Sequence, residues 1–266
     1  MENIIMIDTK IKKMSTPITY YGGKQTMAKI ILPLIPEHFI YSEAFFGGGA
    51  VFFAKPPSRV EFINDFNGEI INFYKVIKQD FPKLRAEIDI TLHSELQHRQ
   101  ATDIYFKRKE DTSIMRAWAV WMLSQQSFYS IFGNSWKCAK NRNMANTINS
   151  KKEQFNELYV KRLEATSIFC RQALDVIVKT DRDDAFHYID PPYFNADMGH
   201  YGGYTANDFE KLLLICSGLK GKFMLSSYPS ELLTKYAKKF NWKVIKYDLH
   251  RPAGKGRKVE VLTMNY

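Results

Sequence analysis

The chain has 266 residues, and its 38 Lys and Arg against 28 Asp and Glu give a formal net charge of +10. This length suffices for one large domain, or a core domain with an insertion, without a disulfide or metal to stabilise it. No apolar run reaches the roughly 20 residues of a membrane span, and charged residues interrupt the N-terminal segment where a signal peptide needs an apolar core. We therefore expect a soluble, cytoplasmic protein that makes no membrane contact.

The cysteines and histidines point to no metal site or disulfide framework. Cys138, Cys170 and Cys216 are far apart and form no CxxC pair, which fits a reducing compartment. The six histidines show no HExxH or other paired ligand spacing. We expect His187, inside an apolar run, to be packed in the core.

Short apolar runs alternate with helical patterns along most of the chain. The segments 42–53 and 60–66 predict successive strands that end in Gly-rich or acidic turns. Helical spacing is present at 68–81, 113–132 and 207–219, and further short apolar runs lie at 167–169, 185–189, 222–227, 242–247 and 259–265. This alternation predicts an α/β fold with a parallel sheet, whose ligand crevice lies at the carboxyl ends of the strands.

The middle of the chain has a different pattern. Residues 80–165 are helical and polar, and 133–152 predict a loop rich in Asn, Ser and Lys. We interpret 80–165 as an inserted, mostly helical subdomain, with 1–79 and 166–266 forming the main domain. Basic residues gather at 137–162 and 235–258, which is typical either of a solvated face or of nucleic-acid binding.

Glycines and an acid follow the first two predicted strands. Gly47, Gly48 and Gly49 permit positive φ and close approach of a ligand to the backbone, although a glycine turn is also common for purely structural reasons. Asp65 stands where an acid can accept hydrogen bonds from ribose hydroxyls, or where it can cap a helix. The upstream segment 19–25, TYYGGKQ, lacks the GxxxxGK[ST] spacing of a triphosphate loop.

The stretch HYIDPPYF, 187–194, ends a predicted strand in a rigid acceptor surface. Pro191 and Pro192 fix φ and remove two backbone donors, so carbonyl oxygens and the Asp190 carboxylate face a ligand without competing N–H groups. Tyr193 adds a flat partner for a planar base. Two acceptors that take both N–H bonds of an exocyclic amine would concentrate the nitrogen lone pair, so the pattern favours amine alkylation.

Together these motifs resemble the Dam-like, phage and prophage type, family of DNA adenine-N6 methyltransferases over nearly the whole chain. The resemblance implies a Rossmann-like S-adenosylmethionine-dependent methyltransferase sheet, with the helical insertion as target-recognition subdomain. It implies double-stranded DNA as partner and a bacterial or phage-infected cell as the setting. Ala44 departs from the proline that is common in the family's EPFxGxG pattern, and Gln172 departs from the family's usual acid near the cofactor adenine.

The family's functional residues carry over to matching positions in this chain. In the cofactor role these are Tyr21, Gly22, Gly23, Lys24, Phe45, Gly47, Gly49, Asp65, Gln172 and Asp190. The catalytic motif matches Asp190, Pro191, Pro192 and Tyr193. For DNA contact we select residues in or near the basic segments, namely Tyr129, Asn134, Trp136, Lys137, Lys140, Arg142, Lys255 and Arg257.

Three other functions stay open from the sequence. The same chemistry can act on cytosine N4, an RNA adenine or a protein amide. A nicotinamide oxidoreductase fits less well, because Phe52 occupies the third glycine position of GxGxxG. A DNA-binding protein that has lost catalysis would also retain parts of these motifs, and Gln172 is the single feature in favour of it.

Overall fold

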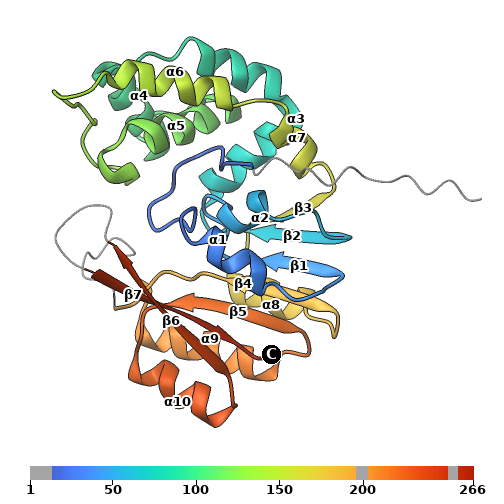
Figure 1. Ribbon diagram of the computed structural model, residues 1–266. Coiled ribbons are helices and arrows are strands. Elements are labelled where there is room, and N and C mark those ends of the chain that lie inside the picture. Colours follow the sequence, from blue (N-terminus) through green and yellow to red (C-terminus); the bar gives the residue numbers. More distant parts are fainter. Residues whose placement is uncertain (1–13, 196–202, 251–256) are drawn as a thin grey trace, which may run out of the picture. The chain divides into compact units, whose positions relative to one another are not determined.

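The computed structural model describes residues 14–195, 203–250 and 257–266, with backbone alone for residues 249, 250, 257 and 258. Seven strands form one sheet in the order β3-β2-β1-β4-β5-β7-β6 (Figure 1). Neighbouring strands among β1 to β5 pair parallel, and β7 pairs antiparallel with β5 and β6. The strands are β1 (Ile40–Glu43), β2 (Val60–Asn64), β3 (Thr166–Phe169), β4 (Ala185–Ile189), β5 (Lys222–Ser227), β6 (Lys243–His250) and β7 (Arg257–Met264).

Helices alternate with the parallel strands, which confirms the predicted Rossmann-like α/β fold. Over the described residues, no helix has both the length and the apolar character to cross a membrane. The helices are α1 (Ala28–Ile31), α2 (Ala50–Ala54), α3 (Gly68–Asp89), α4 (Glu95–Tyr105), α5 (Ser113–Gln126), α6 (Met144–Gln154), α7 (Leu158–Leu163), α8 (Ala173–Thr180), α9 (Ala206–Gly218) and α10 (Glu231–Lys239), with short 3₁₀ turns η1 (Leu32–Leu34) and η2 (Phe128–Ser130).

The chain divides into two compact units. Unit 1 combines the residues up to Leu34 with Gly48–Pro57 and Val76–Arg162. Unit 2 combines Ile35–Gly47, Ser58–Lys75 and Leu163–Tyr266, and it contains the sheet. All elements between β2 and β3 are helical, as the sequence predicts for this region. The functional division of the chain at residues 80 and 165 stays a prediction.

Two segments of unit 1 differ from their predicted structure. The second half of the predicted loop 133–152 is helix α6, because the Asn143 side chain accepts a hydrogen bond from the Asn146 amide at 3.1 Å and caps the helix. Met144 and Ile148, one turn apart, are its only buried apolar residues, so its polar composition hides a narrow buried face. The predicted helix 113–132 ends earlier, at Gln126, where the chain enters a tight hairpin.

A hydrophobic core of unit 2 lies between the sheet and the helices α8, α9 and α10 (Figure 1). Ile177 of α8, Leu212 of α9 and Leu233 of α10 are buried there against Ile189 and Leu225 of the central strands. Each fully buried aliphatic side chain of this kind contributes about 1.5–3 kcal/mol of transfer free energy. This packing fixes the strand ends on which the candidate site is built.

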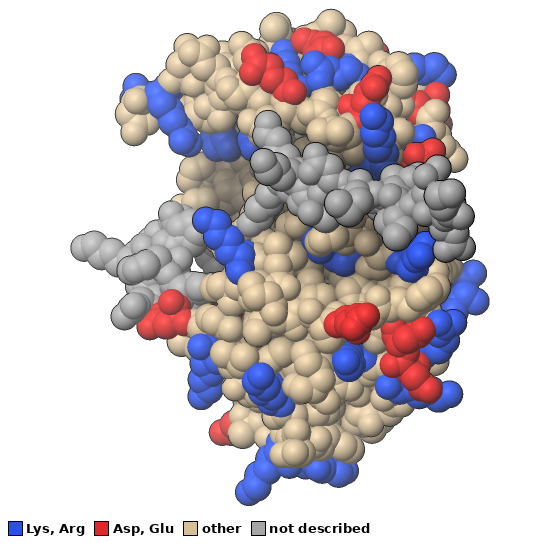
Figure 2. All heavy atoms as spheres, turned by 45° about the vertical axis from the view of Figure 1, so that its right-hand side comes forward, with Lys and Arg blue, Asp and Glu red and all other residues tan. Residues whose placement is uncertain are grey.

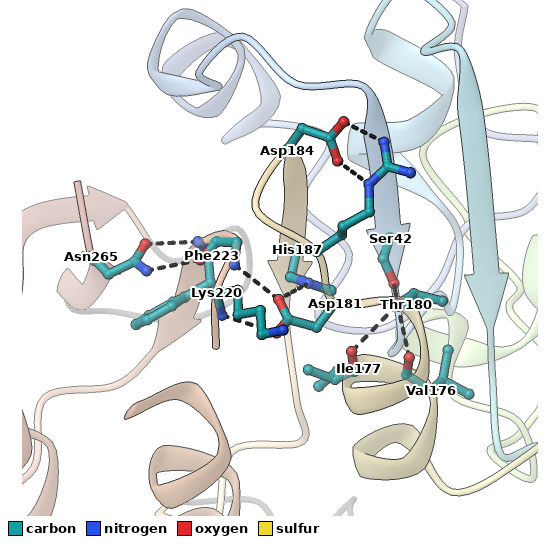
Figure 3. A network of polar contacts seen from close by, with 12 residues as sticks. Ser42, Val176, Ile177, Thr180, Asp181, Asp184, His187, Lys220, Phe223 and Asn265 are labelled. Atoms are coloured by element: carbon teal, nitrogen blue, oxygen red, sulfur yellow. Dashed lines mark hydrogen bonds and ion pairs between the residues drawn. The ribbon is translucent and has the colours of Figure 1, made fainter. Parts of the chain in front are cut away.

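A polar network ties together the amino ends of β4 and β5 (Figure 3). The Asp181 carboxylate accepts hydrogen bonds from the Lys220 and Gly221 amides, both at 2.9 Å. Gly221 is required there, because an added Cβ would lie 2.7 Å from the Ala185 carbonyl oxygen. His187 of β4, with its Nε2 atom 3.4 Å from Asp181, is buried as the sequence predicts.

Acid should destabilise the protein through His187. Burial lowers the pKa of His187 below its usual 6.5, and Asp181 offsets part of this effect. The unfolded chain therefore takes up a proton at higher pH than the folded chain, so the stabilisation is full above about pH 6.5 and is lost as the pH falls below it. Urea unfolding at pH 7.5 and 5.5 measures this loss. The free energy of unfolding of His187→Asn should depend less on pH than that of the wild type. An equal pH dependence in both proteins would show that His187 is not the group responsible.

Candidate active site

Three adjacent parallel strands of unit 2 deliver their predicted site residues to one edge of the sheet. Glu43 at the end of β1 pairs with Ile63 of β2 and with Tyr188 of β4. The residues that follow these strands, including Gly47, Asp65 and Asp190, therefore leave the sheet at its carboxyl edge. The network around Asp181 in Figure 3 lies at the opposite, amino end of β4.

The Asp65 carboxylate holds the glycine loop that follows β1. Gly47 has φ 47°, a left-handed conformation that favours glycine, and its amide donates to Asp65 Oδ2 at 2.7 Å. Asp65 Oδ1 accepts the Asn67 amide at 2.9 Å, close to the start of α3. Burial raises the pKa of Asp65, and these two amide donors offset part of that rise. A carboxylate has about four acceptor positions, so Asp65 can accept further hydroxyl donors.

Asn64, which the sequence reasoning missed, joins three segments at this edge. Its side chain is fully buried, and Nδ2 donates to the carbonyls of Ala44 at 2.9 Å and Arg171 at 3.1 Å. Its Oδ1 accepts the Arg171 amide at 2.9 Å. Gln172, the next residue, is exposed at the N-cap of α8 and makes no side-chain capping bond. Asn64 thus fixes the backbone that presents Gln172 beside the ends of β1 and β2.

A large exposed aromatic residue at the same edge was also missed. Phe66 follows Asp65 directly and has 70% of its surface exposed. An exposed Phe beside an acid and a glycine loop offers a flat apolar face to a planar ligand. Phe45, in contrast, packs against the core under α8, α9 and α10. The sequence signal for Phe66 was its place directly after the acidic end of β2.

The DPPY segment forms a polar and aromatic corner after β4. Pro191 is buried, and the Tyr193 hydroxyl donates to Asp190 Oδ1 at 3.2 Å. The ring of Tyr193 meets Tyr228 edge to face, with centroids 4.5 Å apart. Tyr228 lies just beyond β5, so this corner receives residues from two neighbouring strands. Pro191 and Pro192 have no N–H groups, so the segment presents acceptors.

In unit 1, the segment 21–24 forms a turn close to Gly48. The Lys24 side chain is 5% exposed, and its Nζ donates to the Gly22 carbonyl at 2.9 Å. An added Cβ on Gly48 would lie 3.1 Å from Tyr20 Cβ, so the two segments are in close contact. Gly49, with φ 65°, caps the short helix α2. Unit 1 therefore brings Tyr21, Gly22, Gly23, Lys24 and Gly49 together.

A hairpin after α5 collects four of the predicted DNA-contacting residues. Ser127 and Trp136 form an antiparallel bridge, and the Phe128 amide donates to the Ser135 carbonyl at 2.8 Å. Tyr129 is 46% exposed and left-handed, with φ 56°, which is a strained conformation for an aromatic residue. Asn134 and Lys137 lie on the returning arm of the same hairpin. Within unit 1, Phe132 of this hairpin meets the Tyr20 ring edge to face at 5.9 Å.

A cavity of about 430 Å³ lies between α4 and the hairpin, within unit 1. Trp136 lines it, with its indole N–H donated to Gln126 Oε1 at 3.1 Å and its ring against His93 at 4.5 Å. The remaining lining residues are charged or polar apart from Leu96, and they are Glu95, Leu96, His98, Arg99, Thr102, Asp103, Arg108 and Ser135.

Of the other four predicted DNA contacts, the structure describes the side chains of two. Lys140 and Arg142 are exposed between the hairpin and α6. Burial lowers the pKa of the neighbouring Lys137, and Arg142 and Lys151 lower it further. Lys255 lies outside the described residues, and Arg257 is described by its backbone alone. On the face shown in Figure 2, Lys and Arg side chains occupy several separate places instead of one patch.

No group of three or more His, Cys, Asp or Glu side chains within residues 14–195, 203–250 and 257–266 has the arrangement of a metal site.

Fold and candidate site together define an enzyme of the Rossmann-like methyltransferase class. The chain belongs to the D12 class N6 adenine-specific DNA methyltransferase family, which it matches over residues 20–249. This match confirms the family predicted from the DPPY motif at 190–193 and the FxGxG motif at 45–49, and it covers most of both units. It also argues against the alternative of a nicotinamide oxidoreductase.

Two curated relatives are similar over nearly their full lengths. The type II methyltransferase M1.LlaDCHI of Lactococcus lactis subsp. cremoris is 29% identical over 272 residues, covering 92% of this chain and 93% of that protein. The type II methyltransferase M.MjaIII of Methanocaldococcus jannaschii is 27% identical over 285 residues, covering 94% and 98%.

Solved structures match at much lower similarity. A precorrin 8w decarboxylase of Methanobacterium thermoautotrophicum has a TM-score of 0.38 and 10% identity, with 90% of this chain and 88% of that chain covered. An rRNA methylase of Streptococcus thermophilus has a TM-score of 0.34 and 11% identity, with 90% and 93% covered.

Proposed function

We propose that this enzyme transfers a methyl group from S-adenosylmethionine to the N6 amine of an adenine that is flipped out of double-stranded DNA. The observation that carries this proposal is the convergence of Gly47, Asp65 and Asp190 at the carboxyl edge of three adjacent strands. A glycine loop with an acidic residue suits a nucleoside cofactor, and a proline-locked acid suits an amine.

The residues at this edge fit a nucleoside cofactor. Asp65 has acceptor positions left for ribose hydroxyls, and exposed Phe66 offers an apolar face to adenine. Gln172 can exchange hydrogen bonds with the same ring, in place of an acid. When bound, S-adenosylmethionine supplies a methyl group on a positively charged sulfur. Following the family resemblance, Tyr21, Gly22, Gly23, Lys24, Phe45, Gly47 and Gly49 complete this binding role.

Asp190 and the Pro191 carbonyl then orient the amine. The two acceptors take the two N–H bonds of the target nitrogen and direct its lone pair toward the methyl carbon. Tyr193 stacks on the base, and such stacking contributes about 1–3 kcal/mol against the cost of unstacking the duplex. Bound S-adenosylmethionine would supply the methyl group and leave as a neutral thioether, and Asp190 would accept the proton that the methylated amine gives up. Orientation is the main catalytic effect.

Unit 1 supplies most of the proposed DNA contacts. Tyr129, Asn134, Trp136 and Lys137 lie on one hairpin, and Lys140 and Arg142 follow it in the chain. Exposed cations of this kind bind phosphates and carry little sequence information. Arg257 and Lys255 are proposed as further cationic contacts. The protein would thus bind the phosphate backbone of the duplex, and the flipped base would enter the DPPY corner.

A direct test is incubation with labelled S-adenosylmethionine and unmethylated genomic DNA, followed by modification-sensitive sequencing. N6-methyladenine at a defined sequence supports the proposal. Label at cytosine N4 would show that the target base is cytosine and not adenine. Parallel reactions with RNA show whether the substrate is DNA or RNA. Absence of label in every nucleic acid, with cofactor binding retained, would favour the non-catalytic alternative.

Removing Lys140 and Arg142 together should weaken DNA binding at all sequences. The slope of log affinity against log salt is negative, and each lost phosphate contact reduces its magnitude by about 0.9 for duplex DNA. Fluorescence anisotropy with a labelled duplex at several salt concentrations measures this slope. The control is Lys179→Ala with Lys220→Ala, which removes the same charge near the amino edge of the sheet. Equal slopes for the two double variants would exclude a contact at Lys140 and Arg142.

A further inference from the structure

Ser226, near the end of β5, lies behind the DPPY corner and has no exposed surface. Its Oγ atom is 2.9 Å from the Tyr193 hydroxyl, which is itself 3.2 Å from Asp190 Oδ1. Three side chains from the ends of two adjacent strands therefore form one hydrogen-bonded chain. The sequence motif DPPY contains two of them, and the third comes from a different part of the chain.

The direction of this chain follows from donor and acceptor counting. An ionised Asp190 can only accept, and Tyr193 has a single hydroxyl proton, which it donates to Asp190. Ser226 must then donate its own proton to the Tyr193 oxygen. Both donors thus point toward the carboxylate, and hydrogen bonds in such a series strengthen one another.

The surroundings keep Tyr193 in the donor role. Burial raises the pKa of Tyr193 well above its usual value, and the charges of Asp190 and Glu260 raise it further. The phenol therefore stays protonated across the pH range of an enzyme assay. Tyr228 packs edge to face on the same ring at 4.5 Å, so both the ring and its hydroxyl are held.

We propose that Ser226 is a positioning residue for methyl transfer, acting through the Tyr193 hydroxyl on Asp190. This inference rests on the proposed roles of Asp190 and Tyr193. The hydrogen bond from Ser226 fixes the rotation of the Tyr193 hydroxyl and the plane of its ring. The Tyr193 hydroxyl in turn donates to Asp190 Oδ1 and so fixes the orientation of the carboxylate that accepts a hydrogen from the target amine.

Ser227 provides a matched control at the next position of the same strand. It is also buried, at 3% exposure, and among the described residues its hydroxyl has no hydrogen-bond partner. Ser226→Ala and Ser227→Ala remove the same atom from the same strand at similar depth. Only the first removes a hydrogen bond to the DPPY corner.

The test is a double-mutant cycle with Ser226→Ala, Tyr193→Phe and the two combined, measured by single-turnover methylation of unmethylated genomic DNA with labelled S-adenosylmethionine. We expect Ser226→Ala to lower the rate of methyl transfer about tenfold, with the calorimetric affinity for the cofactor unchanged and Ser227→Ala near the wild type. In the Tyr193→Phe background, Ser226→Ala should have no further effect, because the hydroxyl through which it acts is gone.

Two results would overturn the inference. One is an equal effect of Ser226→Ala and Ser227→Ala, and the other is full additivity of Ser226→Ala with Tyr193→Phe. If Ser226→Ala does not fold, as judged by its melting curve, Tyr193→Phe alone decides, since a wild-type transfer rate without the hydroxyl contradicts the chain. A wild-type protein that methylates no nucleic acid would instead refute the proposed function.

Discussion

Asp190→Ala is expected to lower the rate of methyl transfer about a hundred- to a thousandfold while cofactor binding changes little. Asp190 follows buried strand β4, and in our proposal it accepts one N–H bond of the amine and the proton that the product releases. Without it, the Pro191 carbonyl is the remaining acceptor, and the nitrogen lone pair is no longer oriented. Single-turnover methylation measures the rate, and calorimetry with S-adenosylmethionine measures binding.

Asp181→Ala is the comparison for this variant, because Asp181 precedes the same strand at its amino end and serves the network of Figure 3. It should lower the free energy of unfolding while the transfer rate of the folded protein stays close to the wild type. Methylation by Asp190→Ala at an undiminished rate would remove this residue from the mechanism. A loss of cofactor binding as large as the loss of rate would assign it to binding instead.

Asp65→Asn should weaken S-adenosylmethionine binding about ten- to a hundredfold, the range expected for lost hydrogen bonds to a charged group. Asp65 already accepts the amides of Gly47 and Asn67, so an amide side chain can neither satisfy both donors nor accept from the ribose hydroxyls as well. Calorimetric titration with S-adenosylmethionine measures the loss, at a temperature where the melting curve shows the variant folded.

The raised pKa of Asp65 adds a pH dependence to this prediction. Its carboxylate takes up a proton at higher pH than an aspartate with the usual value of 3.8, so cofactor affinity in the wild type should fall earlier on acidification. Asp65→Asn should lack this decline. The control is Asp183→Asn, an exposed acid before β4 at the amino edge. Equal affinities of the two variants for the cofactor would leave Asp65 with a structural role in the glycine loop alone.

The sequence predicted the sheet class well, because parallel strands must be buried on both faces and so carry short apolar runs. The runs at 185–189 and 222–227 coincide with β4 and β5. It predicted helix α6 poorly, because only Met144 and Ile148 mark its buried face and the cap at Asn143 reads equally well as a loop residue. Helix boundaries in polar segments depend on such local hydrogen bonds.

The candidate site was predictable where its functional residues are adjacent in sequence, as they are in DPPY and in the glycine loop. Residues that act through contacts distant in sequence were not. Asn64 bonds to Arg171, which lies 107 positions away, and Ser226 meets Tyr193 from the neighbouring strand. The sequence shows them as ordinary polar residues near strand ends, and their partners become visible once the register of β4 and β5 is known.

The separation of the two edges of the sheet has an evolutionary consequence. Residues that hold β4 and β5 together, such as Asp181 and Gly221, lie at the amino ends, whereas Asp65, Asp190 and their loops follow the carboxyl ends. Selection for a new target sequence can therefore change the carboxyl-edge loops while the contacts at the amino ends continue to stabilise the fold. Among proteins that share this scaffold, we expect the sequence to vary most in the loops after the carboxyl ends of the strands.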